Sequence, residues 1–258
     1  MLISSASLKR TAKQIIRISR PNAISVGGIY CILSIILSLL SSRLINAGFT
    51  ESRYQWFTNY VQNGQMEQAM QILADMLPSS SEVIIYLLLE ASIVIVAVGF
   101  DIFLLRTVRG DNPSFGNLLD GFGFIGRILL LNILTGIFVS LWSLLFIIPG
   151  IIAAYSYSMA TYLLIDHPEY SVMDCIRASK HMMRGHKGER FVLDLSFIGW
   201  ACLISLSAMP GLSILSAVQL WTVPYMNMTF VLYYEVLRTG GIQLPISWES
   251  GQDQSYYQ

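Results

Sequence analysis

Residues 128–165 contain no charged side chain, and this run limits the folds open to the chain more than any other feature. A helix of about 20 apolar residues is enough to cross the hydrocarbon core of a bilayer. The run is therefore far too long for one crossing, and Pro149-Gly150 divides it. Because a proline ends a helix and a glycine permits a tight reversal, we expect a helical hairpin that turns at this pair.

The rest of the sequence also contains long apolar runs separated by short charged stretches. Only 12% of the residues are charged and 54% are hydrophobic, whereas a soluble domain carries about 25% charged residues. The bilayer is therefore the expected solvent. A second reversal is predicted at Pro210-Gly211. We predict an all-α, polytopic transmembrane helical bundle of about six spans, at residues 23–41, 83–105, 128–148, 149–165, 191–209 and 211–233.

The basic residues predict the orientation, because Lys and Arg near the ends of spans are retained in the cytoplasm. With the N-terminus inside, only Arg43 and Arg53 of the 16 basic residues lie outside. We therefore expect a multi-pass protein of a bacterial inner or plasma membrane with both termini cytoplasmic. The expected parts are a basic interfacial helix (1–22), a membrane domain (23–233), an outer loop (42–81), cytoplasmic segments (106–127 and 166–190) and a cytoplasmic tail (234–258).

Two cytoplasmic segments have the pattern of amphipathic helices that lie on a membrane surface. In the first, basic residues recur at helical spacing and Leu8, Ala12, Ile15 and Ile16 share another side. A charge cluster that only directs topology is the alternative interpretation. In the second, Ser171 and Asp174 resemble a capping box and Gly185 can end the helix. The expected contacts with anionic lipid head groups are Lys9, Lys13, Arg17, Arg177, Lys180 and Arg184.

The outer loop combines an aromatic cluster with an amphipathic stretch. Tyr54, Trp56, Phe57 and Tyr60 lie close together in the sequence, and the apolar residues of 66–77 follow the spacing of a one-faced helix. Packing over the ends of the spans is one interpretation. A gate or a recognition surface for an external partner is the other.

Ionisable residues inside spans are costly, so each is a candidate polar site within the membrane. Asp101, Asp194 and Glu235 lie near span ends, and we expect structural ion pairs with Arg106, Arg190 and Arg238 respectively. Glu90 is deeper in its span. It can bind a cation or a proton, or it can be neutral and hydrogen-bonded to Asn132, Ser140 or Ser143.

No catalytic chemistry is apparent in the sequence. It has no Gly-rich phosphate loop, no HExxH and no GxSxG motif, and the spacing of His181 and His186 does not place two imidazoles on one helical face. We expect no metal, no cofactor and no enzymatic activity. Because the net charge is zero, the composition gives no electrostatic reason to expect nucleic acid as a partner.

Several longer motifs together resemble a known family. They are the run Leu141-Trp142-Ser143-Leu144-Leu145-Phe146-Ile147-Ile148-Pro149-Gly150, the segments 155–159, 182–187 and 191–200, and the shorter groups Arg109-Gly110-Asp111, Asp120-Gly121-Phe122 and Pro224-Tyr225. These motifs resemble the bacterial integral membrane family catalogued as domain of unknown function 975. More loosely, the Ile-Pro-Gly turn and the basic helix after it are similar to the membrane domain of some glycerophosphodiester phosphodiesterases. The looser resemblance implies a module that organises or senses the membrane.

Two functions are compatible with this sequence. The first is a non-enzymatic integral membrane protein that acts by interaction, as a scaffold, an immunity or stress factor, or an accessory subunit of an envelope system. Its expected partners are the lipid bilayer and a membrane protein or a second copy of the chain. The alternative is a transporter or export component with a pathway between the two Pro-Gly hairpin units. The hydroxyl and amide side chains of the spans suffice for hydrogen bonds between helices but are few for an aqueous pathway.

Overall fold

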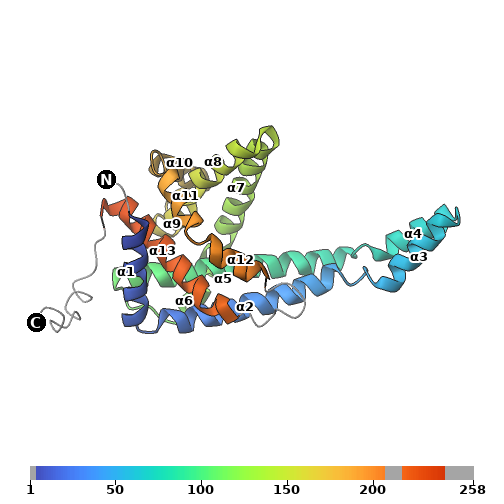
Figure 1. Ribbon diagram of the computed structural model, residues 1–258, viewed down its shortest axis with the longest axis horizontal. Helices are drawn as coiled ribbons and strands as arrows, with labels where there is room; N and C mark the ends of the chain where they lie inside the picture. The colour runs from blue at the N-terminus through green and yellow to red at the C-terminus, as the bar shows by residue number, and fades with distance from the viewer. Residues whose placement is uncertain (1–3, 207–216, 242–258) are drawn as a thin grey trace, which may run out of the picture. The chain divides into compact units, whose positions relative to one another are not determined.

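The computed structural model describes residues 4–206 and 217–241, and every regular element in these residues is helical (Figure 1). In chain order the elements are α1 (Ser5–Ile18), α2 (Ala23–Ile45), α3 (Glu51–Gln62), α4 (Met66–Met76), α5 (Ser80–Arg109), α6 (Asn117–Asp120), the 3-10 helix η1 (Gly121–Phe124), α7 (Ile125–Leu145), α8 (Ile147–Tyr157), α9 (Ala160–Asp166), α10 (Val172–Met182), α11 (Lys187–Leu195), α12 (Ile198–Leu206) and α13 (Gln219–Thr239).

The chain divides into two compact units. One comprises Met1–Cys31 and Ile95–Gln258, and the other is the continuous segment Ile32–Val94. The core of the first unit is formed by the second half of α5 and by α13, where the side chains of Phe100, Phe103, Tyr233 and Tyr234 are almost completely buried. These aromatic side chains bury large areas, so they contribute much of the packing energy of this unit.

Four helical segments of the described residues are long and apolar enough to cross a membrane: Ala23–Ile45, Met66–Arg109, Asn117–Leu145 and Ile147–Asp166. The all-helical fold class is thereby confirmed, and the number of six spans stays a prediction. The predicted span 191–209 is broken into α11 and α12, and its last residues fall outside the described part of the chain. The predicted span 211–233 is described only from residue 217. The predicted turn at Pro210-Gly211 lies outside the described residues.

The hairpin within residues 128–165 forms, but it does not turn where the sequence predicts. Phe146 is the extended residue between α7 and α8, with φ −160° and ψ 151°, whereas Pro149 and Gly150 lie in the first turns of α8. A proline is tolerated there because the first turn of a helix needs no backbone N–H at that position. Gly150 also lacks the positive φ that a glycine in a tight reversal often has, since the described glycines with positive φ are Gly64, Gly110, Gly185 and Gly240.

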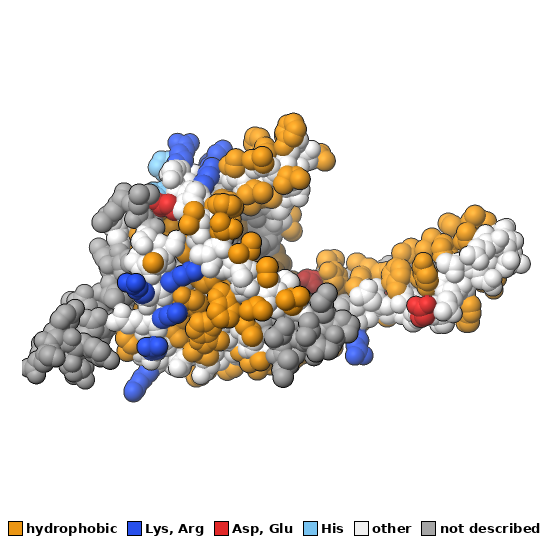
Figure 2. Space-filling view, viewed as in Figure 1, with side chains coloured by type: hydrophobic (Ala, Val, Ile, Leu, Met, Phe, Trp, Pro, Cys, Tyr) orange, Lys and Arg blue, Asp and Glu red, His pale blue; other side chains and the backbone are white. Residues whose placement is uncertain are grey.

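Gly150 is nevertheless required at its position, for a reason of space. A Cβ atom at residue 150 would lie 2.0 Å from the Oγ and 2.9 Å from the Cα of Ser143. The two helices therefore approach each other so closely that only a glycine fits, as at small-residue interfaces between membrane helices. Around this contact the hairpin surface is apolar: Leu144 and Ile147 are 86% and 76% exposed, and Figure 2 shows hydrophobic side chains along this projection.

A buried serine joins the two halves of the returning arm of the hairpin. The helix is interrupted between Tyr157 and Ala160, where α8 ends and α9 begins. Ser179 on α10 donates to the carbonyl of Ser156 at 2.9 Å and accepts from the amide of Met159 at 3.1 Å. Because an unpaired buried backbone group is costly, this single side chain stabilises the break.

The amphipathic pattern of the N-terminal segment is confirmed, but its apolar face meets protein. Leu8, Ala12, Ile15 and Ile16 are buried, and α1 packs against α13 and α11. Figure 2 shows Lys and Arg side chains gathered over α1, next to hydrophobic side chains. The helix therefore presents its basic side outward and uses its apolar side to hold the first unit together.

In the second unit, the predicted amphipathic stretch forms α4 and packs against α3 as a helical hairpin. Ala69 and Met76 are buried, while Met66, Met70 and the aromatic residues Tyr54 and Trp56 are exposed. Only part of the predicted apolar face is thus covered within this unit.

Candidate functional site

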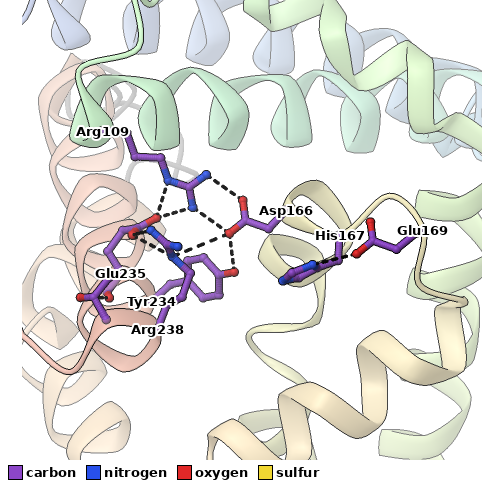
Figure 3. A network of polar contacts seen from close by, with 8 residues as sticks. Arg109, Asp166, His167, Glu169, Tyr234, Glu235 and Arg238 are labelled. Atoms are coloured by element: carbon purple, nitrogen blue, oxygen red, sulfur yellow. Dashed lines mark hydrogen bonds and ion pairs between the residues drawn. The ribbon is translucent and has the colours of Figure 1, made fainter.

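The most connected polar site joins three helix ends of the first unit (Figure 3). Arg109 is the last residue of α5, Asp166 is the last residue of α9, and α13 contributes Tyr234 and Glu235 near its end. We call this set, together with Arg238, the polar junction. Two guanidinium groups and two carboxylates meet here, so the formal charges of the polar junction cancel.

Arg109 forms the centre of the polar junction. Its two terminal nitrogens donate to the two carboxylate oxygens of Asp166 at 2.8 and 2.7 Å, which is the bidentate geometry that suits guanidinium and carboxylate. Its Nε donates to Oε1 of Glu235 at 2.7 Å, and a second, shorter contact joins the same two side chains. One arginine thus connects the ends of α5, α9 and α13.

The remaining members complete the network. Arg238 donates to Oε2 of Glu235 at 2.7 Å, and the hydroxyl of Tyr234 donates to Oδ2 of Asp166 at 2.7 Å. The ring of Tyr234 stacks on Tyr162, with centroids 5.1 Å apart. The carboxylates are only 8% and 10% exposed, compared with 42% for Arg238, so the negative groups are held inside and the network opens outward at Arg238.

A cavity of about 490 Å³ lies next to the polar junction. Its charged lining includes Arg109 and Asp166 from the junction and also Arg106 and Asp120, which form an ion pair at 3.5 Å. Ile102, Leu105 and Phe124 supply apolar walls. Asp111 also lines the cavity, which therefore offers both signs of charge, with three carboxylates and two guanidinium groups.

Two of the three predicted ion pairs near span ends form. Glu235 pairs with Arg238 as expected, and Asp194 pairs with Arg190 at 3.5 Å. The expected pair of Asp101 and Arg106 is wrong: Arg106 pairs with Asp120 instead, and within the described residues no ion pair involves Asp101. The spacing of five residues on one helix places these two side chains off a common face.

Glu90 has a hydrogen-bond partner that the sequence did not suggest. The hydroxyl of Ser41 on α2 donates to Oε1 of Glu90 at 3.0 Å, within the second unit. The expected partners, Asn132, Ser140 and Ser143, belong to α7, and Asn132 donates instead to the carbonyl of Ile128 in its own helix. The interpretation of Glu90 as a hydrogen-bonded residue thus has a partner on another helix.

The predicted basic contacts occupy two exposed helix faces. On α10, the cap by Ser171 is confirmed, since its Oγ accepts from the amide of Asp174 at 3.2 Å. The side-chain hydrogen bond from Ser171 lowers the pKa of Asp174. Gly185 has the positive φ expected of a residue that follows a helix. Arg177 pairs with Asp174, and Lys180 and Arg184 are exposed.

On α1, two lysines lie over aromatic rings. Lys9 donates to the carbonyl of Ser196 at 3.0 Å and its Nζ is 4.0 Å from the ring centroid of Phe197, while Nζ of Lys13 is 5.5 Å from that of Tyr225. Burial lowers the pKa of Lys9, and the positive charge of Lys13 lowers it further. Arg17, one turn after Lys13, is exposed.

Sequence reasoning missed Arg109, Asp166 and Tyr234 as members of one site. Arg109 and Asp166 are 57 positions apart, and Arg109 and Glu235 are 126 apart, so no local spacing connects them. The only available signal was a carboxylate or an arginine at each of three helix ends. In the described part of the chain, no three His, Cys, Asp or Glu side chains gather in a way that could hold a metal ion.

Comparison with known proteins extends over part of the chain. No curated protein and no solved structure matches it. A family model does match residues 144–240, which begin at the tip of the α7–α8 hairpin and include Asp166 and all the α13 members of the polar junction. Over these residues the chain is similar to the family described as Protein of unknown function (DUF975), which supports the resemblance found in the motifs.

Proposed function

We propose that the chain is a non-enzymatic protein of a bacterial inner membrane that acts by interaction, as a scaffold, an immunity or stress factor, or an accessory subunit of an envelope system. In this proposal it has six spans and both termini lie in the cytoplasm. Its partners are anionic lipid and either another membrane protein or a second copy of the chain. The looser resemblance to a phosphodiesterase membrane domain agrees with a role in organising the membrane.

The observation that carries this proposal is that the charges of the polar junction are engaged with one another. Arg109 is shared by two nearly buried carboxylates, one of which also accepts from Arg238 and the other from Tyr234. A general base or a coupling carboxylate must be able to gain and lose a proton during its work. Carboxylates fixed in this way instead hold the ends of three helices together.

The exposed face of α7 provides the surface for a test of the interaction. Ile133, Ile137 and Leu141 are 48–58% exposed along this helix, whereas Leu131 on the same helix is 2% exposed. A photo-crosslinking residue placed at Ile137 in cells should give one discrete protein adduct, and the same residue at Leu131 should give none. Adducts with lipid alone at Ile133, Ile137 and Leu141 would count against a protein partner.

The orientation can be tested separately with topology reporters. An alkaline phosphatase fusion at Gly64 should be active, because this residue lies in the proposed outer segment, and a fusion at Lys187 should be inactive. Reporters after Arg20, Arg109 and Gln258 should all behave as cytoplasmic. An inactive fusion at Gly64 together with an active one at Lys187 would reverse the proposed orientation.

Transport is the second candidate, and the cavity beside the polar junction is the observation that favours it. Its volume of about 490 Å³ and its mixed charged lining are those expected of a vestibule that receives a small polar solute. A transporter of this kind would require an ionisable residue deeper in the membrane, for which Glu90 is the candidate. Substitution of Glu90 therefore discriminates the two functions, as described in the Discussion.

A further inference from the structure

A smaller cavity, of about 190 Å³, lies in the first unit where α1, the start of α2 and α13 meet. The rings of Trp221 and Tyr225 form one wall, with centroids 5.1 Å apart and planes inclined by 30°. Lys13 and Arg17 from α1 border it on another side and Ile16 and Ile24 complete it, so that the lining is almost entirely apolar. We call this cavity the basic-aromatic pocket.

The walls of the basic-aromatic pocket are fixed by close packing. A Cβ atom at Gly27 would lie 2.2 Å from Cγ of Pro224, so α2 and α13 pack closely here and a larger residue at position 27 would overlap the proline ring. Ile16 and Tyr225 are 4% and 5% exposed. Because neighbouring helices hold these side chains, a ligand would meet a preformed site and lose little free energy in ordering it.

The positive charge at the basic-aromatic pocket has no nearby counter-charge. Within residues 4–206 and 217–241, no carboxylate lies within 4.0 Å of the side-chain nitrogens of Lys13 or Arg17. The sequence also has no Asp or Glu before Glu51. Two cations one helical turn apart, without an acid, favour an anion as the ligand, and a guanidinium suits phosphate oxygens in particular.

The position of the basic-aromatic pocket relates that anion to the bilayer. Ile24 is the second residue of α2, the first of the segments that are apolar enough to span a membrane. Tryptophan and tyrosine are enriched at the level of the lipid head groups, where one end of the ring is apolar and the other wet. We propose that Lys13 and Arg17, which border this pocket, bind the phosphate of an anionic phospholipid head group. The inference deepens the proposed interaction with anionic lipid and assigns it to one site.

Trp221 lies in the pocket and reports on its occupancy. The full chain is reconstituted in nanodiscs of phosphatidylcholine with increasing phosphatidylglycerol, and quenching of tryptophan fluorescence by brominated phosphatidylglycerol is compared with quenching by brominated phosphatidylcholine. We expect preferential quenching by the anionic lipid. Because the rings of Trp200 and Trp221 lie only 5.8 Å apart, we expect the double variant W200F/W221F to remove that preference, while the other tryptophans are still quenched by phosphatidylcholine.

The matched control lies at the C-terminal end of α10. Lys180 in α10 and Arg184, two residues after its end, are exposed and have the same sequence spacing as Lys13 and Arg17, and neither contributes to the basic-aromatic pocket. A basic residue near an anionic surface contributes on the order of fivefold in affinity, so K13Q/R17Q should raise the half-saturating phosphatidylglycerol fraction by roughly 25-fold. The control K180Q/R184Q should change it by less than about twofold if the pocket, and not diffuse charge, binds the lipid.

Three results would overturn the assignment. One is an equal loss in both double variants, which would indicate diffuse attraction of basic helices to the membrane. Another is retention of the preference in W200F/W221F. The third is loss of all preferential quenching when millimolar inorganic phosphate is added, which would identify a free phosphate site. The photo-crosslinked protein adduct at Ile137 is measured in the same K13Q/R17Q chain. If that adduct persists in K13Q/R17Q while the lipid preference is lost, the lipid site and the protein interaction are separable. If the unmodified chain gives the adduct but shows no lipid preference, the lipid site is overturned and the protein interaction stands.

Discussion

The α7–α8 hairpin and the polar junction are two regions of the same unit that are stabilised by opposite means. From residue 128 onward the hairpin has no charged residue, its tip is exposed, and its helices meet where Gly150 lies against Ser143. The polar junction is held by Arg109 between nearly buried carboxylates. In hydrocarbon, close packing stabilises helix contacts, whereas outside it a set of paired charges can specify which helix ends meet.

The largest effect is expected where a charge would be left without its partner. Arg109→Met leaves Asp166 and Glu235 nearly buried with less positive charge, and loss of one partner of a buried ion pair costs about 3–5 kcal/mol. The free energy of unfolding in detergent measures this loss. Arg238→Met is the control, since this residue is 42% exposed and should cost about 1 kcal/mol or less. Equal effects of the two substitutions would show that Arg109 is not the centre of the network.

The next effect tests close packing in the hairpin. Gly150→Leu should destabilise the protein by about 1–3 kcal/mol, because even the first atom of its side chain overlaps Ser143. Gly136→Leu on α7 is a matched control, since nothing lies within 4 Å of a Cβ atom there. Thermal unfolding of both variants makes the comparison. Ser143→Gly should restore part of the stability of Gly150→Ala, and failure to do so would place the strain elsewhere.

A smaller effect separates hydrogen bonding from charge in the polar junction. Tyr234→Phe removes the hydroxyl that donates to Asp166 but keeps the ring that stacks on Tyr162. A hydrogen bond to a charged group contributes about 1.5–3 kcal/mol, so the loss should be smaller than that of Arg109→Met. Equilibrium unfolding of the two single variants and the double variant gives their coupling energy. Strict additivity would mean that Asp166 does not link the two side chains.

The smallest effect concerns Glu90, a carboxylate with a neutral partner. Glu90→Gln should be tolerated in stability and in any phenotype of deletion, whereas Glu90→Leu should lose about 1 kcal/mol, the scale of one hydrogen bond between membrane helices. Ser41→Ala should resemble Glu90→Leu because it removes the same bond. Unfolding in detergent and complementation in cells are both measured. A Glu90→Gln variant that folds normally but fails to complement would make ion-coupled transport the preferred function.

Local patterns in the sequence predicted local structure well. The buried face of α1 and the Ser171 cap of α10 depend on spacings of three or four residues, which a helix imposes directly. The turn at Pro149-Gly150 was wrong because proline is compatible with both the end and the first turn of a helix, and the pattern alone does not distinguish them. The sequence also did not predict that α13 covers the apolar face of α1, because the two helices are far apart in the chain.

The polar junction could be predicted only in part for the same reason. The pair of Glu235 and Arg238 has helical spacing and was expected. The partners of Arg109 come from tertiary structure, and neither their distance nor their order in the chain suggests the contact. The contact of Ser41 with Glu90 is of this kind too, because a serine in a helix can bond to its own backbone, as Ser41 also does to the carbonyl of Ser38 at 3.0 Å, and the sequence does not reveal a second partner.

The proline three residues into α8 has a consequence for the solvation of the hairpin tip. A helix start leaves four amide positions unpaired, here those of residues 146–149. Phe146 donates to the carbonyl of Trp142 at 3.3 Å, and Pro149 has no N–H to satisfy. Only the amides of Ile147 and Ile148 remain, and each unpaired amide in hydrocarbon costs several kcal/mol. Half of the usual desolvation penalty of a helix start is thereby absent, so this turn can enter apolar surroundings at a lower cost than an ordinary helix start.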